Sequence, residues 1–211
     1  MYKRQILISE VFESNGGSAK YVELYNTTSS DIVLDQPSSP WQLNLKLFGS
    51  STIVINLSGT IAANGFFVIG TNDVDTLFGT GTVDQVSSSI THDGDDTYNL
   101  IINYPIKNKG GLSNIIDSFA ADLNTSERKG GSFFANDVVA HRVASQLPND
   151  GRWRASSPIK NPAKVASPSG FWELTALTAS DANATTAATP GAGGGAGGTE
   201  LPVELESFSI E

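Results

Sequence analysis

Two glutamates, Glu10 and Glu23, are the residues of this sequence whose types and spacing first suggest chemistry. Each lies within a short apolar stretch, ILISEV at residues 6–11 and YVELYN at residues 21–26. If these stretches pair as strands, the two carboxylates lie close together and could act as a general acid and a general base. The alternative is structural, because buried polar groups need hydrogen-bond partners, and Glu23 and Asn26 would then bind loop backbone. We favour the structural role and predict no catalytic residue.

Five aspartates suggest a different kind of site, a calcium ion held by loops. They occur near the two ends of residues 70–96, and they are Asp73, Asp75, Asp93, Asp95 and Asp96. Calcium prefers several carboxylate and carbonyl oxygens, and loops at one end of a sandwich can converge on an ion. Neither segment has the spacing or the terminal glutamate of an EF-hand loop. Calcium is therefore a candidate cofactor, and solvated turn aspartates are the alternative.

The sequence contains two histidines, His92 and His141, and either could in principle belong to a Ser-His-Asp triad. No Gly-x-Ser-x-Gly turn or comparable nucleophile motif accompanies them. We expect His92, next to Asp93, to be exposed in a loop, and His141, before Arg142, to lie at a strand end. Neither histidine is predicted to be catalytic.

Tryptophans could stack on sugar rings, since a flat aromatic face with a polar rim suits carbohydrate. Trp41 begins an alternating strand pattern and is expected in the core. Trp153 lies between Arg152 and Arg154, and these three residues are the candidate binding site for a surface ligand. The alternative for Trp153 is packing, in which it pins a Pro-rich segment to the sheet.

The charge and the cysteine content exclude several classes of protein. Thirteen basic and 22 acidic residues give a formal net charge of -9, which disfavours nucleic acid as a partner because phosphate binding needs clustered Lys and Arg. With no cysteine, the chain can form neither a disulfide framework nor a thiolate metal site. No run of about 18 apolar residues occurs, so we expect no transmembrane helix.

Short alternating or apolar segments separated by Gly- and Asn-rich turns dominate the chain. The expected strands are residues 5–12, 19–25, 32–34, 41–48, 52–57, 66–69, 97–103, 115–119 and, more weakly, 138–143. Residues 70–96 contain four glycines and no apolar period, and we expect long loops with at most one helical turn. Many short strands with little helix predict an all-β, immunoglobulin-like β-sandwich, with a β-barrel as the alternative.

The C-terminal third of the chain differs in composition from the strand-rich part that precedes it. Residues 148–172 are rich in proline and are expected to wrap the sandwich in extended and turn conformations. Residues 179–199 are rich in Gly, Ala and Thr, as is typical of a flexible linker. We therefore predict a domain over residues 1–178, a linker over 179–199, and the start of a truncated segment over 200–211.

The opening pair ILISEV and YVELYN resembles the N-terminal signature of the lamin tail domain family. Further segments occur in the order that the family shows: Val33-Leu34, then Trp41, then IAANGFFVIG at residues 61–70 and the strands around Ile116-Asp117-Ser118-Phe119. Thr189-Pro190-Gly191 is similar to the tripeptide that often closes such domains in bacterial proteins. The resemblance implies an immunoglobulin-like sandwich without enzymatic activity, with Glu10, Glu23, Asn26, Trp41 and Asp117 as motif or structural residues.

The segment LPVELESF, residues 201–208, resembles the stretch that precedes the sorting domain of proteins exported by the bacterial type IX route. This resemblance implies a secreted or surface-anchored bacterial protein, whose leader and sorting domain are expected to lie outside the sequence. The expected function is a non-catalytic module that binds a protein or carbohydrate at the cell surface or positions an attached domain. A purely structural spacer, or an accessory fragment of a secreted hydrolase or nuclease with a calcium-dependent site, is the alternative.

Overall fold

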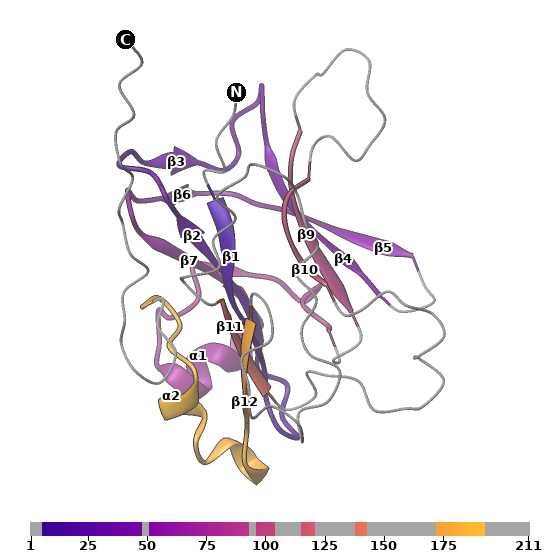
Figure 1. Cartoon of the computed structure of the whole chain (residues 1–211), viewed down its shortest axis with the longest axis vertical. Helices are drawn as coiled ribbons and strands as arrows, with labels where there is room; N and C mark the ends of the chain where they lie inside the picture. Colours follow the sequence, from indigo (N-terminus) through magenta and orange to yellow (C-terminus); the bar gives the residue numbers. More distant parts are fainter. Residues whose placement is uncertain are drawn as a thin grey trace.

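A computed structural model describes residues 6–47, 51–92, 96–103, 115–120, 138–142 and 172–192. Within these residues the regular structure is mostly β-strand, arranged in one six-stranded, one four-stranded and one two-stranded sheet (Figure 1). The small sheet pairs β3 (Ile32–Val33) with β6 (Thr60–Ile61).

The six-stranded sheet combines segments from both ends of the described chain. Its spatial order is β12 (Trp172–Ala176), β11 (Val138–Arg142), β1 (Ile6–Glu13), β2 (Lys20–Asn26), β7 (Phe66–Gly70) and β8 (Gln85–Val86). All neighbouring pairs are antiparallel except β7 and β8. The opening hairpin thus forms the middle of the sheet, as the Gly-rich loop between its two apolar stretches predicts.

The four-stranded sheet is antiparallel and packs against the first. Its order is β10 (Ile115–Ala120), β9 (Thr97–Ile102), β4 (Trp41–Lys46) and β5 (Thr52–Asn56). In β4 the burial alternates: Trp41, Leu43 and Leu45 are buried, and the polar residues between them are less so. This is the period of two expected from WQLNLKLF.

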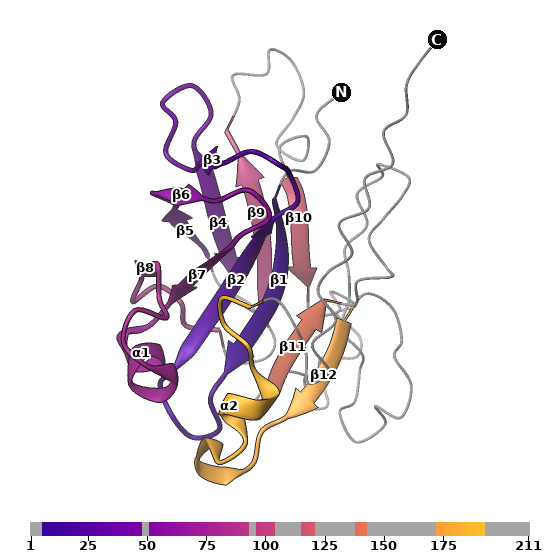
Figure 2. The same ribbon diagram turned by 90° about the vertical axis from the view of Figure 1, so that its left-hand side faces the viewer.

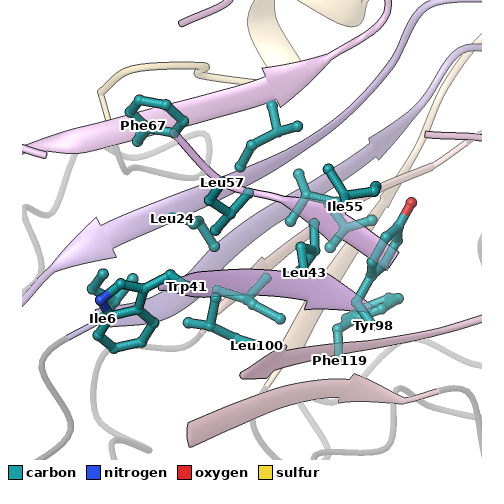
Figure 3. Close-up of a cluster of buried hydrophobic side chains, with 14 of the residues drawn as sticks. Ile6, Leu24, Trp41, Leu43, Ile55, Leu57, Phe67, Tyr98, Leu100 and Phe119 are labelled. Atoms are coloured by element: carbon teal, nitrogen blue, oxygen red, sulfur yellow. The ribbon is translucent and has the colours of Figure 1, made fainter. Parts of the chain in front are cut away.

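A continuous apolar core fills the space between the two large sheets (Figure 3). Leu24 and Phe67 come from the six-stranded sheet, and Leu43, Tyr98 and Leu100 come from the four-stranded sheet. The two sheets face each other across this core, so the predicted all-β sandwich is confirmed. In the part of the chain that the structure describes, the two sheets are separate, and they do not close into the alternative barrel.

A second apolar cluster covers the opposite, outer face of the six-stranded sheet. Here α1 (Asn72–Phe78), the 3-10 turn η4 (Ala179–Asp181) and α2 (Ala184–Ala187) lie beside the ends of β1, β2 and β11 (Figure 2). Phe12 and Tyr21 stack on this face, with ring centroids 5.1 Å apart, and Val74 of α1 packs in the same cluster. Because both faces of the sheet are covered, every residue of β1 is buried.

The expected linker over residues 179–199 is wrong for its first part. Ala184, Ala187 and Ala188 are buried in the outer cluster, and the side chain of Asp181 accepts hydrogen bonds from Ser14 Oγ and the Asn15 N–H, both at 2.6 Å. Small alanine side chains let this segment approach the sheet closely, so an Ala- and Thr-rich composition does not prevent packing. The packed region therefore extends beyond residue 178, at least to Gly191. Residues 193–199 and the segment 200–211 lie outside the described residues.

Candidate functional site

Glu10 and Glu23 lie directly opposite each other on β1 and β2. A β-bulge in β1 between Ile8 and Glu10 shifts the register, so Ile8 and Val11 both face the inner core while Glu10 turns to the outer face. Bulges re-aim side chains in this way. Glu10 is 1 % and Glu23 0 % exposed, so the structure brings the two carboxylates together in a buried place.

Both carboxylate oxygens of Glu10 accept hydrogen bonds from the chain itself. Oε1 accepts from the Tyr21 hydroxyl and, at 3.2 Å, from the Thr189 N–H. Oε2 lies 3.1 Å from His141 Nδ1 and accepts from Thr189 Oγ1 at 3.2 Å. Three elements, β2, β11 and the segment after α2, thus meet on one carboxylate.

The two oxygens of Glu23 are satisfied in the same manner. Ser9 Oγ, in the bulge of β1, donates to Oε1 at 2.6 Å, and the Gly191 N–H donates to Oε2 at 2.7 Å. Gly191 has a φ of 82°, a conformation that glycine adopts without strain. We call residues 177–192 the C-terminal strap, because this segment crosses β1 and β2 and is attached to both glutamates (Figure 2).

His141 completes the network from the neighbouring strand, where it pairs with Glu10. Its Nε2 lies 2.7 Å from the Ala187 carbonyl oxygen, and its Nδ1 faces the Glu10 carboxylate. Both ring nitrogens therefore face acceptors, an arrangement that suits the imidazolium. Burial by itself lowers the pKa of His141, but the hydrogen bond and charge of Glu10 outweigh it, and the net pKa is raised.

Burial raises the pKa of Glu23 to about 8, and the nearby charge of Glu10 adds to the effect, so Glu23 holds a proton near neutral pH. Two carboxylates side by side do not readily both ionise in such a site. The arrangement contains the residue types of acid–base catalysis, but their hydrogen-bonding capacity is used within the protein.

A pH dependence of stability follows from Glu23. Its folded-state pKa is raised above the ordinary value of 4.5, so the folded state binds the proton more tightly and the free energy of unfolding falls as pH rises from 4.5 to about 8. The variant Glu23→Gln keeps the shape and removes this titration, and we expect its stability to fall less over that range. Urea unfolding at a series of pH values measures the slope. Asp35→Asn, at an exposed position, is the control, and equal slopes for Glu23→Gln and wild type would contradict the assignment.

Asp117 forms a second buried polar contact, with Arg142 of β11. The guanidinium donates to the Asp117 carboxylate through one terminal nitrogen, and Arg142 Nε donates to the Ile8 carbonyl at 2.6 Å. The Ile8 N–H in turn donates to Asp117 Oδ2 at 2.9 Å. This contact links β10 of the four-stranded sheet to β1 and β11 of the other sheet, next to the bulge.

Asn26 and Trp41 have structural positions. The Asn26 amide donates to the carbonyl oxygens of Ser30, Ile61 and Ala62 at 2.8–3.2 Å and accepts from the Thr28 N–H and hydroxyl. Asn26 therefore joins the turn after β2 to the end of β6. Trp41 is 3 % exposed and packs in the inner core.

The expectation that His92 is exposed is wrong, since it is 3 % exposed. Its Nε2 lies 2.9 Å from the Phe12 carbonyl oxygen and must donate to it, so Nδ1 accepts from the Tyr98 hydroxyl at 2.7 Å. Burial and, to a lesser degree, the charge of Lys20 lower the pKa of His92 to about 3. His92 is thus a neutral residue that connects β1 to β9.

The candidate calcium ligands do not form a cluster in the described part of the chain. Ser18 donates to the Asp73 carboxylate, and the Gly81 and Val83 N–H groups donate to the carboxylate of Asp75. Those backbone donors lower the pKa of Asp75. Asp96 is buried rather than solvated. No group of three or more His, Asp or Glu that could hold a metal ion occurs among the described residues.

Asp93 and Asp95, as well as Arg152, Trp153 and Arg154, lie outside the described residues. The network also contains Ser9 and Tyr21, which sequence reasoning did not select, and His141, Thr189 and Gly191, which it did not connect with the glutamates. One available signal was Thr189-Pro190-Gly191, whose hydroxyl and backbone N–H groups supply three of the donors.

Comparison with known proteins supports the resemblance. No curated protein matches the chain. None of the helices in the described ranges has the length and hydropathy needed to cross a membrane. A model of the Lamin Tail Domain family, whose members are immunoglobulin-like domains without enzymatic activity, matches residues 1–120. With more than half of its length matched, the chain belongs to the lamin tail domain family.

Proposed function

We propose that this chain is a structural module of a secreted or surface-anchored bacterial protein, and that it holds the polypeptide following residue 192 at a fixed place on the sandwich. The observation that carries this proposal is the attachment of the strap. Thr189 and Gly191 donate to Glu10 and Glu23 in the middle of the six-stranded sheet, so part-buried hydrogen bonds hold the end of the strap against the sheet. Hydrogen bonds whose acceptor is an ionised carboxylate are stronger than neutral ones.

The same contacts support a non-catalytic role for the glutamate pair. A general acid or base must come within hydrogen-bond reach of the substrate. Glu10 and Glu23 are at most 1 % exposed, and their oxygens already accept from the chain's own donors. The pair therefore fits the attachment of the strap better than it fits a reaction.

Secretion and surface attachment are supported by LPVELESF, the segment resembling the lead-in to a type IX sorting domain. A sandwich that holds the end of its own chain at a fixed place is suited to positioning an attached domain at a cell surface. Fractionation of the bacterium that produces the full protein tests this part, and a signal confined to the cytoplasm would contradict it.

The positioning function is tested by measuring where the strap ends. The chain has no cysteine, so spin labels can be attached to Ser58→Cys and Ala192→Cys, both at exposed positions, for a pulsed electron resonance distance measurement. We expect one narrow distance distribution. Thr189→Val combined with Glu23→Leu removes the hydroxyl donor to Glu10 and the acceptor of the Gly191 N–H without changing the backbone at Gly191, and we expect this pair of changes to broaden the distribution severalfold.

The matched control is Thr185→Val, an exposed change in the same strap that is expected to leave the distance distribution narrow. Circular dichroism shows whether the labelled variants keep their β-structure. A broad distribution already in the unsubstituted strap, or a narrow one in the double variant, would show that the glutamates do not set the exit point.

A second candidate function, recognition of a surface carbohydrate or protein, is favoured by the outer face of the four-stranded sheet. Gln42, Asn44 and Asn99 lie on that face, and the Gln42 amide donates to Asn56 Oδ1 at 2.8 Å. Asn56 is exposed, whereas Asn44 Oδ1 is buried. Neutral amides are suited to sugar hydroxyls, so binding on a glycan array that Asn56→Ala weakens would support this function, and binding that Asn56→Ala leaves unchanged would contradict it.

A further inference from the structure

The strand β5 ends the four-stranded sheet, and its outer edge is the basis of a separate inference. In the described residues β4 is the one strand that pairs with β5, and β4 lies between β5 and β9. At the C-terminal end of β5 the Gln85 side chain donates to the Asn56 carbonyl at 2.9 Å and accepts from the Ser58 N–H at 3.0 Å, so the edge is open from Thr52 to Val54 and covered at Asn56. Figure 1 shows β5 at the margin of the molecule. A strand at the edge of a sheet presents backbone N–H and C=O groups that can pair with another strand.

The composition of β5 lacks the features that usually block such pairing. Its sequence TIVIN contains no charge and no proline, and three of its residues are β-branched and apolar. Val54, in the centre, is 50 % exposed, while Thr52 and Asn56 on the same face are also exposed. Natural edge strands more often carry lysine, proline or a bulge, and the register of β5 with β4 is regular over all five residues.

The charge distribution around β5 favours a second copy of this chain as the binding partner. The chain as a whole carries a net charge of -9, so two copies repel each other over most approaches. The strands β4 and β5 together contain one lysine, Lys46, and no acidic residue. This edge is therefore a place where a second, equally acidic copy can approach without acid-to-acid contact.

The strand is also complementary to itself. In an antiparallel pairing about a two-fold axis at Val54, the valine of one copy lies opposite the valine of the other, and Thr52 lies opposite Asn56. The Thr52 N–H of the second copy then replaces Gln85 Nε2 as the donor to the Asn56 carbonyl. From the register of β4 with β5, Lys46 lies beside Thr52 and Gln42 beside Asn56, so the two lysines of the pair fall at opposite ends. On the inner face, half-buried Ile53 would meet Ile55 of the second copy.

We propose that β5 is a self-association edge, through which two copies of this chain pair their four-stranded sheets into one continuous eight-stranded sheet. This pairing does not depend on the strap or on the glutamate pair. An interface of two short strands is small, so the dimer is expected to be weak and to form only at high protein concentration.

Sedimentation equilibrium of the full chain over a wide concentration range tests the proposal. We expect a reversible monomer–dimer equilibrium in the wild type. Val54→Lys and Val54→Glu each place like charges opposite each other in the pair, and each is expected to weaken dimerisation by at least about tenfold. An equimolar mixture of the two variants pairs opposite charges and is expected to associate more tightly than either variant alone.

Val33→Lys is the matched control, because Val33 of β3 is 39 % exposed and lies in the two-stranded sheet, away from β5. Its dimerisation is expected to equal that of the wild type. A readout without substitutions is amide hydrogen exchange, which should slow in Thr52–Asn56 and not in Ile32–Val33 as the wild-type concentration rises. A wild type that stays monomeric, a dimer that Val54→Lys leaves intact, or a mixture without gain would overturn the proposal.

Discussion

Replacing Arg142 by methionine is expected to lower the free energy of unfolding by about 3–5 kcal/mol, because it leaves the buried Asp117 carboxylate without its cation. Asp117 is 4 % exposed and Arg142 7 % exposed, so water cannot easily replace the lost partner. The Ile8 carbonyl also loses the donor that Arg142 Nε supplies at 2.6 Å. Urea-induced unfolding followed by tryptophan fluorescence measures the change.

The double variant Arg142→Met with Asp117→Leu separates the cost of an unpaired charge from the value of the contact itself. Replacing both members of a buried ion pair by apolar residues is often close to neutral. The double variant also leaves the Ile8 N–H and carbonyl without these side-chain partners, so we expect it to recover part of the stability that Arg142→Met loses. Equal losses in the single and the double variant would show that packing around Arg142, rather than the buried charge, accounts for the effect.

Introducing a carboxylate beneath the strap, with Ala187→Glu, is expected to destabilise the protein by about 3 kcal/mol or more, or to detach the strap from the sheet. Ala187 is 3 % exposed and packs in the outer cluster. A charge buried there has no partner, and its desolvation is costly. Thermal unfolding measures the first outcome, and limited proteolysis within residues 177–192 measures the second.

Thr185→Glu is the matched control, because Thr185 lies in the same short helix, α2, at an exposed position. Its stability is expected to remain within about 0.5 kcal/mol of the wild type, as for most surface substitutions. If Ala187→Glu behaves like Thr185→Glu, the segment from Ala179 to Gly191 is a linker after all, and the domain ends where its composition changes.

The alternation of apolar residues was sufficient to predict the sandwich. Trp41, Leu43 and Leu45 share one face because successive side chains on a strand point to opposite sides, a property of the backbone that needs no tertiary information. The pairing of Glu10 with Glu23 was likewise predictable from two apolar stretches joined by a short Gly-rich loop. Two-residue strands such as β6 and β8 carry too few residues to show a period.

The strap and the histidines were not predictable, since their environment comes from distant parts of the chain. His92 has polar neighbours in sequence, but its buried partner is the Phe12 carbonyl, 80 positions away. The alanines of α2 are small enough to suit either a linker or a close contact. Composition records how much apolar surface a segment offers, and it contains no information on whether an apolar partner surface is present.

Local alternation and turn chemistry thus decided which segments became strands and which faces of most strands are apolar, because these depend on residues a few positions apart. Only the folded chain decided that Glu10 faces outward, through a bulge at which the Ile8 N–H binds Asp117, 109 positions away. It also decided that the two glutamates hold the strap, since Thr189 is 179 positions from Glu10. Buried polar groups form hydrogen bonds with the donors that the tertiary structure brings within about 3 Å. Local periodicity in the sequence does not predict which donors these are.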